Sequence, residues 1–213
     1  MHAPRAILFD MDGVLLDSKE VWFKLVEESG TRFRGHPVTR EEFGPTFGQG
    51  TEADVRVFGL RCTPAELDRF YVENFGRHAS EVWVNPEAKP VLEALQAQGF
   101  RLAVVTNTVS KLAKELLEAS GLLAHFETLA CADLVPKAKP APDLVHFACR
   151  GLNVSEQDAW MIGDSKYDRG SANAAGVYFV GFKLDGDARV ESLSELRATV
   201  ESLHPARPRR TRP

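Results

Sequence analysis

The chain has 213 residues, of which 44% are hydrophobic and 26% are charged, and its formal net charge is −4. These values are typical of a globular protein with one sizeable core, or a core with an insert, and they argue against nucleic acid as a partner attracted by overall charge. Three scattered cysteines exclude a disulfide framework or a zinc site, and each is expected to be a small buried side chain. There is no signal-peptide pattern and no apolar run long enough to span a membrane, so we expect a cytoplasmic enzyme.

The first predicted element is the apolar run Ala6-Ile7-Leu8-Phe9, which is typical of a strand buried on both faces. Asp10 and Asp12 follow at once. Because alternate residues of a strand point to the same side, these two carboxylates are expected to share a side and to repel each other. A divalent cation would offset the repulsion, and Mg²⁺ is a hard ion that prefers oxygen ligands. This stretch therefore predicts a magnesium site at a strand end.

Residues 18–83 show only helical and loop patterns. Helices are predicted from Ser18 to Gly30, over 51–58 and over 64–79, with the glycine- and proline-rich stretch 31–50 as a loop. The helix at 64–79 has a clear start, because Thr63 and Glu66 form a capping-box pattern around Pro64. We interpret 18–83 as a small helical cap inserted after the first strand.

From residue 84 onward, apolar runs alternate with amphipathic stretches. Strands are predicted over 101–105, 126–130, 159–162 and 177–180, and helices over 86–99, 110–120, 139–150, 167–175 and 193–203. This alternation predicts an α/β fold, a doubly wound and mostly parallel sheet with helices on both faces and its ligand site at the carboxyl ends of the strands. The predicted core is thus residues 1–17 and 84–203, and the basic tail 204–213 is expected to be disordered.

Polar residues follow each predicted strand. Thr106 and Asn107 offer a hydroxyl and backbone amides that could hold phosphate oxygens, although a simple turn would have the same residues. Lys139 precedes a proline at a predicted helix start, where its ammonium group could bind phosphate. The start of a helix carries partial positive charge, so it is an unfavourable place for a cation with only a structural role. Asp164 and Asp168 are four residues apart and can share one helix face. Together with the two acids of the first strand they would repel one another without a metal.

Asp10-Met11-Asp12-Gly13-Val14 resembles the first motif of the haloacid dehalogenase (HAD) superfamily of phosphohydrolases. The family's second, third and fourth motifs resemble the stretches at Thr106, at Lys139-Pro140 and at Gly163-Asp164, in the same order and at strand ends. The resemblance covers residues 5–17 and 84–185, and it covers the cap only in type. It implies a HAD-like Rossmannoid core with a helical cap.

The resemblance also implies phosphoryl transfer through an aspartyl-phosphate. Asp10 would be the nucleophile and Asp12 the general acid and base. The substrate phosphate would be bound by Lys139, Thr106 and backbone amides near Met11, Asp12 and Asn107. Mg²⁺ would be held by Asp10, the main-chain carbonyl of Asp12 and Asp164, with Asp168 orienting these ligands.

Several relatives fit this pattern to different degrees. Asp12 disfavours dehalogenases and phosphonate-cleaving relatives, which lack an acid at that position. Sugar-phosphate mutases resembling beta-phosphoglucomutase usually carry a histidine five residues after Asp17, where this chain has Trp22. We therefore predict a phosphatase of the phosphoglycolate phosphatase-like type, with a mutase, a pyrophosphatase and a non-catalytic HAD-fold binding protein as alternatives.

Substrate choice is expected to lie in the cap. The cationic candidates there are Arg32, Arg34, His36, Arg56, Arg61, Arg69 and Arg77. One of these arginines could grip the carboxylate of phosphoglycolate with two hydrogen bonds. We expect a small phosphorylated metabolite as the partner, no membrane, no nucleic acid, and either a monomer or a homodimer.

Overall fold

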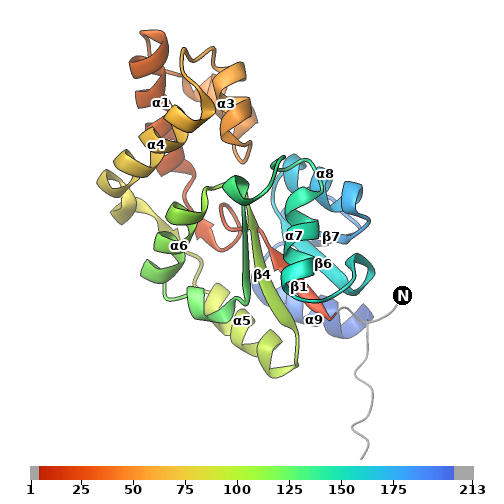
Figure 1. Ribbon diagram of the computed structural model, residues 1–213. Helices are drawn as coiled ribbons and strands as arrows, with labels where there is room; N and C mark the ends of the chain where they lie inside the picture. Colours follow the sequence, from red (N-terminus) through yellow and green to blue (C-terminus); the bar gives the residue numbers. More distant parts are fainter. Residues whose placement is uncertain (1–4, 204–213) are drawn as a thin grey trace, which may run out of the picture.

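A computed structural model describes residues 5–203 of the chain (Figure 1). Within these residues, six parallel strands form the main sheet in the order β5-β4-β1-β6-β7-β8. The strands are β1 (Ala6–Phe9), β4 (Arg101–Thr106), β5 (Thr128–Cys131), β6 (Ala159–Gly163), β7 (Tyr178–Phe182) and β8 (Ala188–Val190). The predicted doubly wound parallel sheet is confirmed. The short edge strand β8 was not predicted, because three residues are too few to show a period.

Helices alternate with most of these strands along the chain. The α-helices are α1 (Lys19–Arg34), α2 (Arg40–Phe43), α3 (Thr51–Val57), α4 (Pro64–Asn74), α5 (Ala88–Ala97), α6 (Ser110–Ala119), α7 (Asp143–Gly151), α8 (Lys166–Ala175) and α9 (Leu193–Leu203). Single 3₁₀ turns lie at η1 (Gly44–Thr46), η2 (Phe75–Arg77), η3 (Ala79–Glu81), η4 (Leu123–His125), η5 (Ala132–Leu134) and η6 (Glu156–Asp158).

The two faces of the sheet have separate apolar cores. On β1, Ile7 and Phe9 belong to one core, and Ala6 and Leu8 belong to the other. Helices α7 and α8 pack against the second face, whereas α5, α6 and α9 contribute leucines to the first. Every residue of β1 is therefore fully buried, which explains its uninterrupted apolar sequence.

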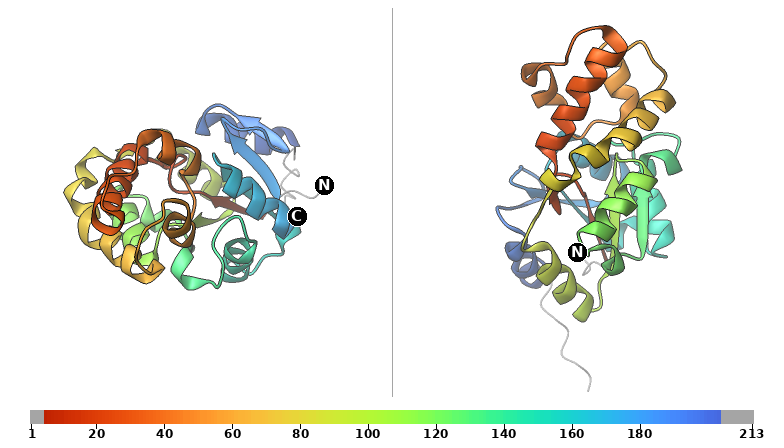
Figure 2. Two further views of the ribbon diagram at one scale, coloured as in Figure 1. Left: turned by 90° about the horizontal axis from the view of Figure 1, so that it is seen from above. Right: turned by 90° about the vertical axis from the view of Figure 1, so that its left-hand side faces the viewer.

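Residues 18–83, hereafter the helical lobe, lie beyond one end of the sheet, shown in red to yellow in Figures 1 and 2. The two connections to the lobe run side by side as a small antiparallel ribbon of β2 (Leu16–Asp17) and β3 (Trp83–Val84). The predicted boundaries of the cap fall within this ribbon. Trp22 of α1 packs edge-on against Tyr71 of α4, with ring centroids 5.4 Å apart, so the lobe has an apolar interior. That the lobe is a separate domain remains a prediction.

The end of the first helix was predicted wrongly. Gly30 does not end α1, which continues to Arg34 and stops at Gly35 with φ of 91°. Gly30 instead gives room for a close contact, because a Cβ atom there would lie 2.6 Å from the backbone nitrogen of Val38. The stretch 31–50, predicted as loop, also contains α2, which begins with a capping box at Thr39.

Other boundaries differ by a few residues. The start of the predicted helix 139–150 was wrong, because α7 begins at Asp143. Lys139 is therefore not in a first helical turn. The capping box predicted at Thr63 is confirmed, since Thr63 accepts from the Glu66 backbone and the Glu66 side chain accepts from Thr63.

The tail predicted to be disordered, 204–213, lies outside the described residues. Among residues 5–203, no helix is both long and apolar enough to cross a membrane.

Candidate active site

Three neighbouring strands end at one edge of the sheet, facing the helical lobe (Figure 1). Asp10 follows β1, Thr106 ends β4 and Asp164 follows β6. β1 lies between β4 and β6, so this edge contains the point at which the strand order reverses. A cavity of about 50 Å³ opens here, lined by residues of both the core and the lobe. The topology thus brings the predicted motifs to one place.

Lys139 lies at the centre of a buried ion-pair network. Its Nζ atom donates to Asp10 Oδ1 at 2.8 Å, to Asp168 Oδ1 at 2.6 Å and to the backbone oxygen of Val105 at 2.9 Å. These three acceptors use all three ammonium hydrogens. Burial by itself lowers the pKa of Lys139, but the carboxylates of Asp10 and Asp168 outweigh it and raise the pKa above its usual value. Lys139 is therefore a fixed positive charge.

Asp10, Asp164 and Asp168 form a tight acidic group. Carboxylate oxygens of the three residues lie within 4.8 Å of one another. Burial, followed by repulsion from Asp168, raises the pKa of Asp10 well above its usual range and that of Asp164 to about 7. Both effects disfavour three charges in so small a volume when one lysine is the only nearby cation among the described residues.

Asp164 has an unused buried oxygen. Its Oδ1 atom has no hydrogen-bond partner among the described residues. Gly13, with φ of +89°, lies directly against the same carboxylate, and a Cβ atom at position 13 would collide with it. An orphaned carboxylate oxygen beside two further carboxylates is a donor set suited to a hard divalent cation.

The carboxylate of Asp12 is turned away from this acidic group. Its Oδ1 atom accepts hydrogen bonds from Ser18 Oγ and from Trp22 Nε1, the latter at 3.0 Å. Its Oδ2 atom accepts from Thr108 Oγ1 at 2.9 Å. Two of these donors belong to the lobe side of the chain, so the lobe and the core together fix this carboxylate.

The second motif is held by hydrogen bonds around Asn107. The Asn107 side chain accepts from the backbone of Lys139 at 2.8 Å and donates to the backbone oxygens of Lys139 and Gly48. Thr106 Oγ1 accepts from the Thr108 backbone at 3.0 Å. The Asn107 side chain therefore joins the third motif to the lobe.

Met11 is fully buried, and its backbone N–H donates to Asp10 Oδ1 at 2.8 Å. This contact fixes the rotamer of the Asp10 carboxylate at the strand end.

Sequence reasoning missed several residues of the site. Trp22 was singled out only for standing where mutases usually carry histidine, and its contact with Asp12 was not foreseen. Ser18 and Thr108 were not singled out, although each lies close in sequence to a motif and carries a hydroxyl. These positions could have been found only by asking which hydroxyls lie beside a predicted carboxylate.

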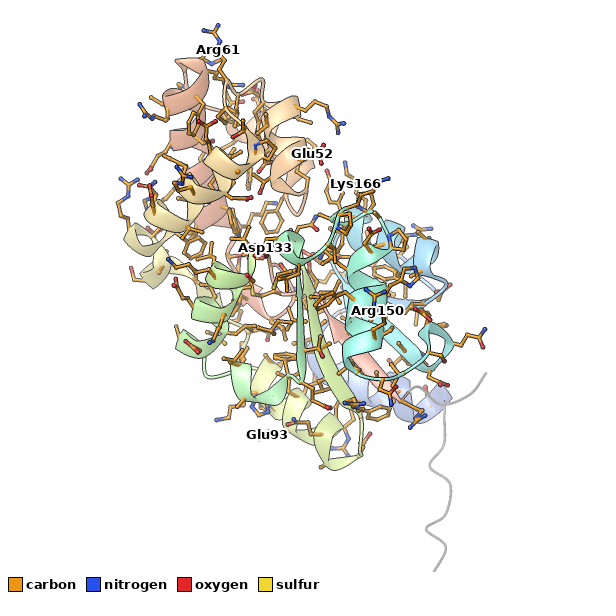
Figure 3. All side chains as sticks on the ribbon, viewed as in Figure 1. Glu52, Arg61, Glu93, Asp133, Arg150 and Lys166 are labelled. Carbon is orange, nitrogen blue, oxygen red and sulfur yellow. The ribbon has the colours of Figure 1, made fainter. Side chains whose placement is uncertain are left out.

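The cationic residues of the lobe do not reach the cavity. None of the seven candidates from residues 32 to 77 is among its lining residues. Arg34 is half-buried and pairs with Glu42, whereas Arg77 is exposed and pairs with Glu28. Arg61 lies at the outer tip of the lobe, directed away from the core (Figure 3).

Comparisons with known proteins match this architecture. Residues 7–182 match the family described as haloacid dehalogenase-like hydrolase. The chain is 36% identical over 226 aligned positions to the plasmid-encoded phosphoglycolate phosphatase of Cupriavidus necator, covering 95% of this chain and 94% of the relative. It is 32% identical over 178 positions to a protein provisionally named pyrophosphatase PpaX from Caldanaerobacter subterraneus, covering 84% and 81%. The crystal structure of beta-phosphoglucomutase from Clostridium difficile shares the fold, with a TM-score of 0.81 at 17% identity and coverage of 94% and 98%.

Proposed function

The chain belongs to the haloacid dehalogenase-like hydrolase family, and we propose that it is a phosphatase of the phosphoglycolate phosphatase-like type. It would hydrolyse a small phosphate monoester through an aspartyl-phosphate. The observation that carries this proposal is the position of Asp10, a buried carboxylate that pairs with Lys139 and lines the cavity. A nucleophile, a fixed cation and an adjoining second carboxylate are the groups that this chemistry needs.

In the proposed mechanism, an Asp10 carboxylate oxygen attacks phosphorus in line with the leaving oxygen. The bond from phosphorus to that oxygen breaks, and Asp12 gives it a proton, so the free alcohol leaves. Asp12 then takes a proton from water, whose oxygen attacks the phosphorus of the aspartyl-phosphate and releases inorganic phosphate. Asp10 is regenerated as a carboxylate. Three donors hold Asp12 at the lobe side of the cavity, where a leaving group would lie.

Lys139 would neutralise the phosphoryl oxygens as charge develops on them. Thr106, with the backbone amides of Met11 and Asn107, would complete their binding. In the present structure the Met11 amide donates to Asp10 itself, so phosphate would replace one carboxylate oxygen as its acceptor.

We propose Mg²⁺ as the cofactor. Asp10, Asp164 and the main-chain carbonyl of Asp12 would hold it, and Asp168 would orient them. The orphaned Asp164 oxygen and the three crowded carboxylates support this choice. The bound cation would supply positive charge toward the phosphoryl oxygens.

A pyrophosphatase is the second candidate, favoured by the relative from Caldanaerobacter subterraneus. The mutase alternative has weaker support, because the likeness to beta-phosphoglucomutase extends to the fold alone, and Trp22 occupies the position where such mutases usually carry histidine. A non-catalytic binding protein is disfavoured, since every predicted catalytic carboxylate and the lysine are present.

As partner we propose a small phosphorylated metabolite, with the chain a cytoplasmic monomer or homodimer that needs neither membrane nor nucleic acid. These proposals rest on the sequence.

The test is phosphate release from phosphoglycolate, a hexose phosphate, a nucleotide, p-nitrophenyl phosphate and pyrophosphate, each with and without Mg²⁺. We expect Mg²⁺-dependent release from at least one monoester. Release from pyrophosphate alone would favour the second candidate, and no release from a folded protein would overturn the proposed activity.

A further inference from the structure

The lobe side of the cavity is acidic. Two carboxylates, Asp54 of α3 and Asp68 of α4, line it together with Gln49, Thr51 and Tyr71. Among residues 5–203, Lys139 is the one cationic side chain in the lining, and its three hydrogens are already used. When Asp54 and Asp68 are both ionised, the part of the cavity beyond the reacting phosphate therefore presents negative charge to a leaving group.

Asp54 is rigidly held. It is 8% exposed, and its Oδ1 and Oδ2 atoms accept from Gln49 Nε2 at 2.7 Å and from Tyr71 Oη at 3.0 Å. Burial raises its pKa to about 7. Because burial already disfavours the ionised form of Asp54, a further anion beside it would raise the free energy of that form still more.

Asp68 lies beside it at the margin of the cavity. Its Oδ1 atom accepts from Thr51 Oγ1 at 2.6 Å, and burial raises its pKa as well. Each carboxylate has further lone pairs, so each can accept a hydrogen bond from a ligand.

The rest of the lobe-side wall is apolar and aromatic, with Trp22, Phe43 and Phe47 among its members. The lobe side of the cavity thus combines two carboxylates with an aromatic surface.

We infer that the leaving group of the natural substrate carries hydrogen-bond donors and no anionic group. This inference rests on the proposed phosphatase function, and within that function it disfavours both phosphoglycolate and pyrophosphate as the natural substrate. The donors are either hydroxyls, as in a short polyol, or an ammonium, as in an amino alcohol. Both chemistries suit Asp54 and Asp68, whereas a carboxylate or a second phosphate would be repelled by them. The aromatic wall also tolerates a cation.

The experiment compares kcat/KM for three compact esters with Mg²⁺ at one pH well above 7, because the pKa of Asp54 is about 7 and the carboxyl must be ionised. The esters are glycerol phosphate, ethanolamine phosphate and phosphoglycolate. p-Nitrophenyl phosphate is the reference for the basic activity. We expect kcat/KM for the better of the first two esters to exceed that for phosphoglycolate by about tenfold or more, the scale of one hydrogen bond to a charged group. Preference for glycerol phosphate would identify the donors as hydroxyls, and preference for ethanolamine phosphate would identify them as an ammonium.

Preference for phosphoglycolate, or turnover of p-nitrophenyl phosphate with no preference among the three esters, would overturn the inference and leave the phosphatase standing. No release from any compound would overturn the phosphatase, and the inference with it.

Variants test the same point within the protein. At this pH, Asp54→Asn and Asp68→Asn each remove one negative charge at nearly constant volume. We expect each to lower the ratio of kcat/KM for the better ester to kcat/KM for phosphoglycolate by about tenfold. Glu52→Gln is the matched control, because Glu52 is an exposed residue of α3 outside the lining (Figure 3). Asp68 is only half-buried, so its variant keeps the test valid if Asp54→Asn fails to fold. An unchanged ratio in the folded variants would contradict the inference.

Discussion

The indole Nε1 of Trp22 lies 3.0 Å from Oδ1 of Asp12. Trp22 belongs to the lobe and Asp12 follows a core strand, so this hydrogen bond, like the one from Ser18, links the lobe to the proposed general acid. Trp22 also packs edge-on against Tyr71 and Phe75, with centroid distances of 5.4 and 5.5 Å. The aromatic packing holds the indole ring of Trp22 in place, and the hydrogen bond from that ring orients the carboxylate of Asp12.

Trp22→Phe keeps most of this aromatic packing and removes the N–H donor. We expect kcat to fall by about tenfold, since a hydrogen bond to a charged group contributes ~1.5–3 kcal/mol, with little change in thermal unfolding. Trp83→Phe is the control, because Trp83 is 57% exposed. Equal activity of the two variants would show that the contact does not position Asp12.

Asp10→Asn should abolish turnover, because an amide oxygen is a poor nucleophile toward phosphorus. The fold and stability should stay close to those of the wild type, since the volume is unchanged and Asp168 still pairs with Lys139 at 2.6 Å. Phosphate release and thermal unfolding measure the two effects. Substantial residual release would contradict the assignment of Asp10 as nucleophile.

Lys139→Met tests the buried ion pairs. The Lys139 side chain is 2% exposed and bridges Asp10 and Asp168. Its removal leaves two buried carboxylates without a cation, and we expect the free energy of unfolding in urea to fall by about 3–5 kcal/mol, along with activity. Lys137→Met, at an exposed neighbouring position, should change neither. A small stability loss at position 139 would mean that the carboxylates take up protons instead.

A chelator should silence the enzyme reversibly, and added Mg²⁺ should raise the unfolding temperature of the wild type, because a ligand that binds only the folded state stabilises it. Asp164→Asn should weaken that rise. Asp185→Asn, whose side chain is 84% exposed before substitution, should behave as the wild type. Metal-independent activity would argue against the carboxylate group as a Mg²⁺ site.

Asp54 gives a prediction for stability as a function of pH. Burial raises its pKa from 3.8 to about 7, so the folded state binds this proton more tightly than the unfolded state does. The stabilisation that this tighter proton binding gives the folded state is complete below pH 3.8, and it is lost as the pH rises through the folded-state pKa of about 7. Relative to Asp54→Asn, the wild type should therefore lose stability across this window, by up to ~4 kcal/mol at 1.36 kcal/mol per pKa unit. Urea unfolding of both proteins at a series of pH values measures the difference, and parallel curves would be the contrary result.

Much of the fold and of the candidate site could be predicted from the sequence. The residues of β1 are apolar at every position because both faces of the sheet are covered. Alternating strands and helices imply a parallel sheet, and a parallel sheet brings the carboxyl ends of its strands to one edge. For this reason the sequence predicts that Asp10, Thr106 and Asp164 lie together, and membership of the HAD-like family confirms the resemblance drawn from the same motifs.

Other features depended on how the lobe packs. Glycine commonly ends helices, but Gly30 lies inside α1, where it leaves room for the backbone of Val38. The lobe arginines carry the charge expected for a carboxylate, yet they lie outside the cavity, and Asp54 lies within it. Local periodicity sets which face of a helix is apolar, but it does not set which polar residue at its margin faces another segment. Which polar residue faces the cavity, like the contact between Trp22 and Asp12, is determined by how distant parts of the chain pack together.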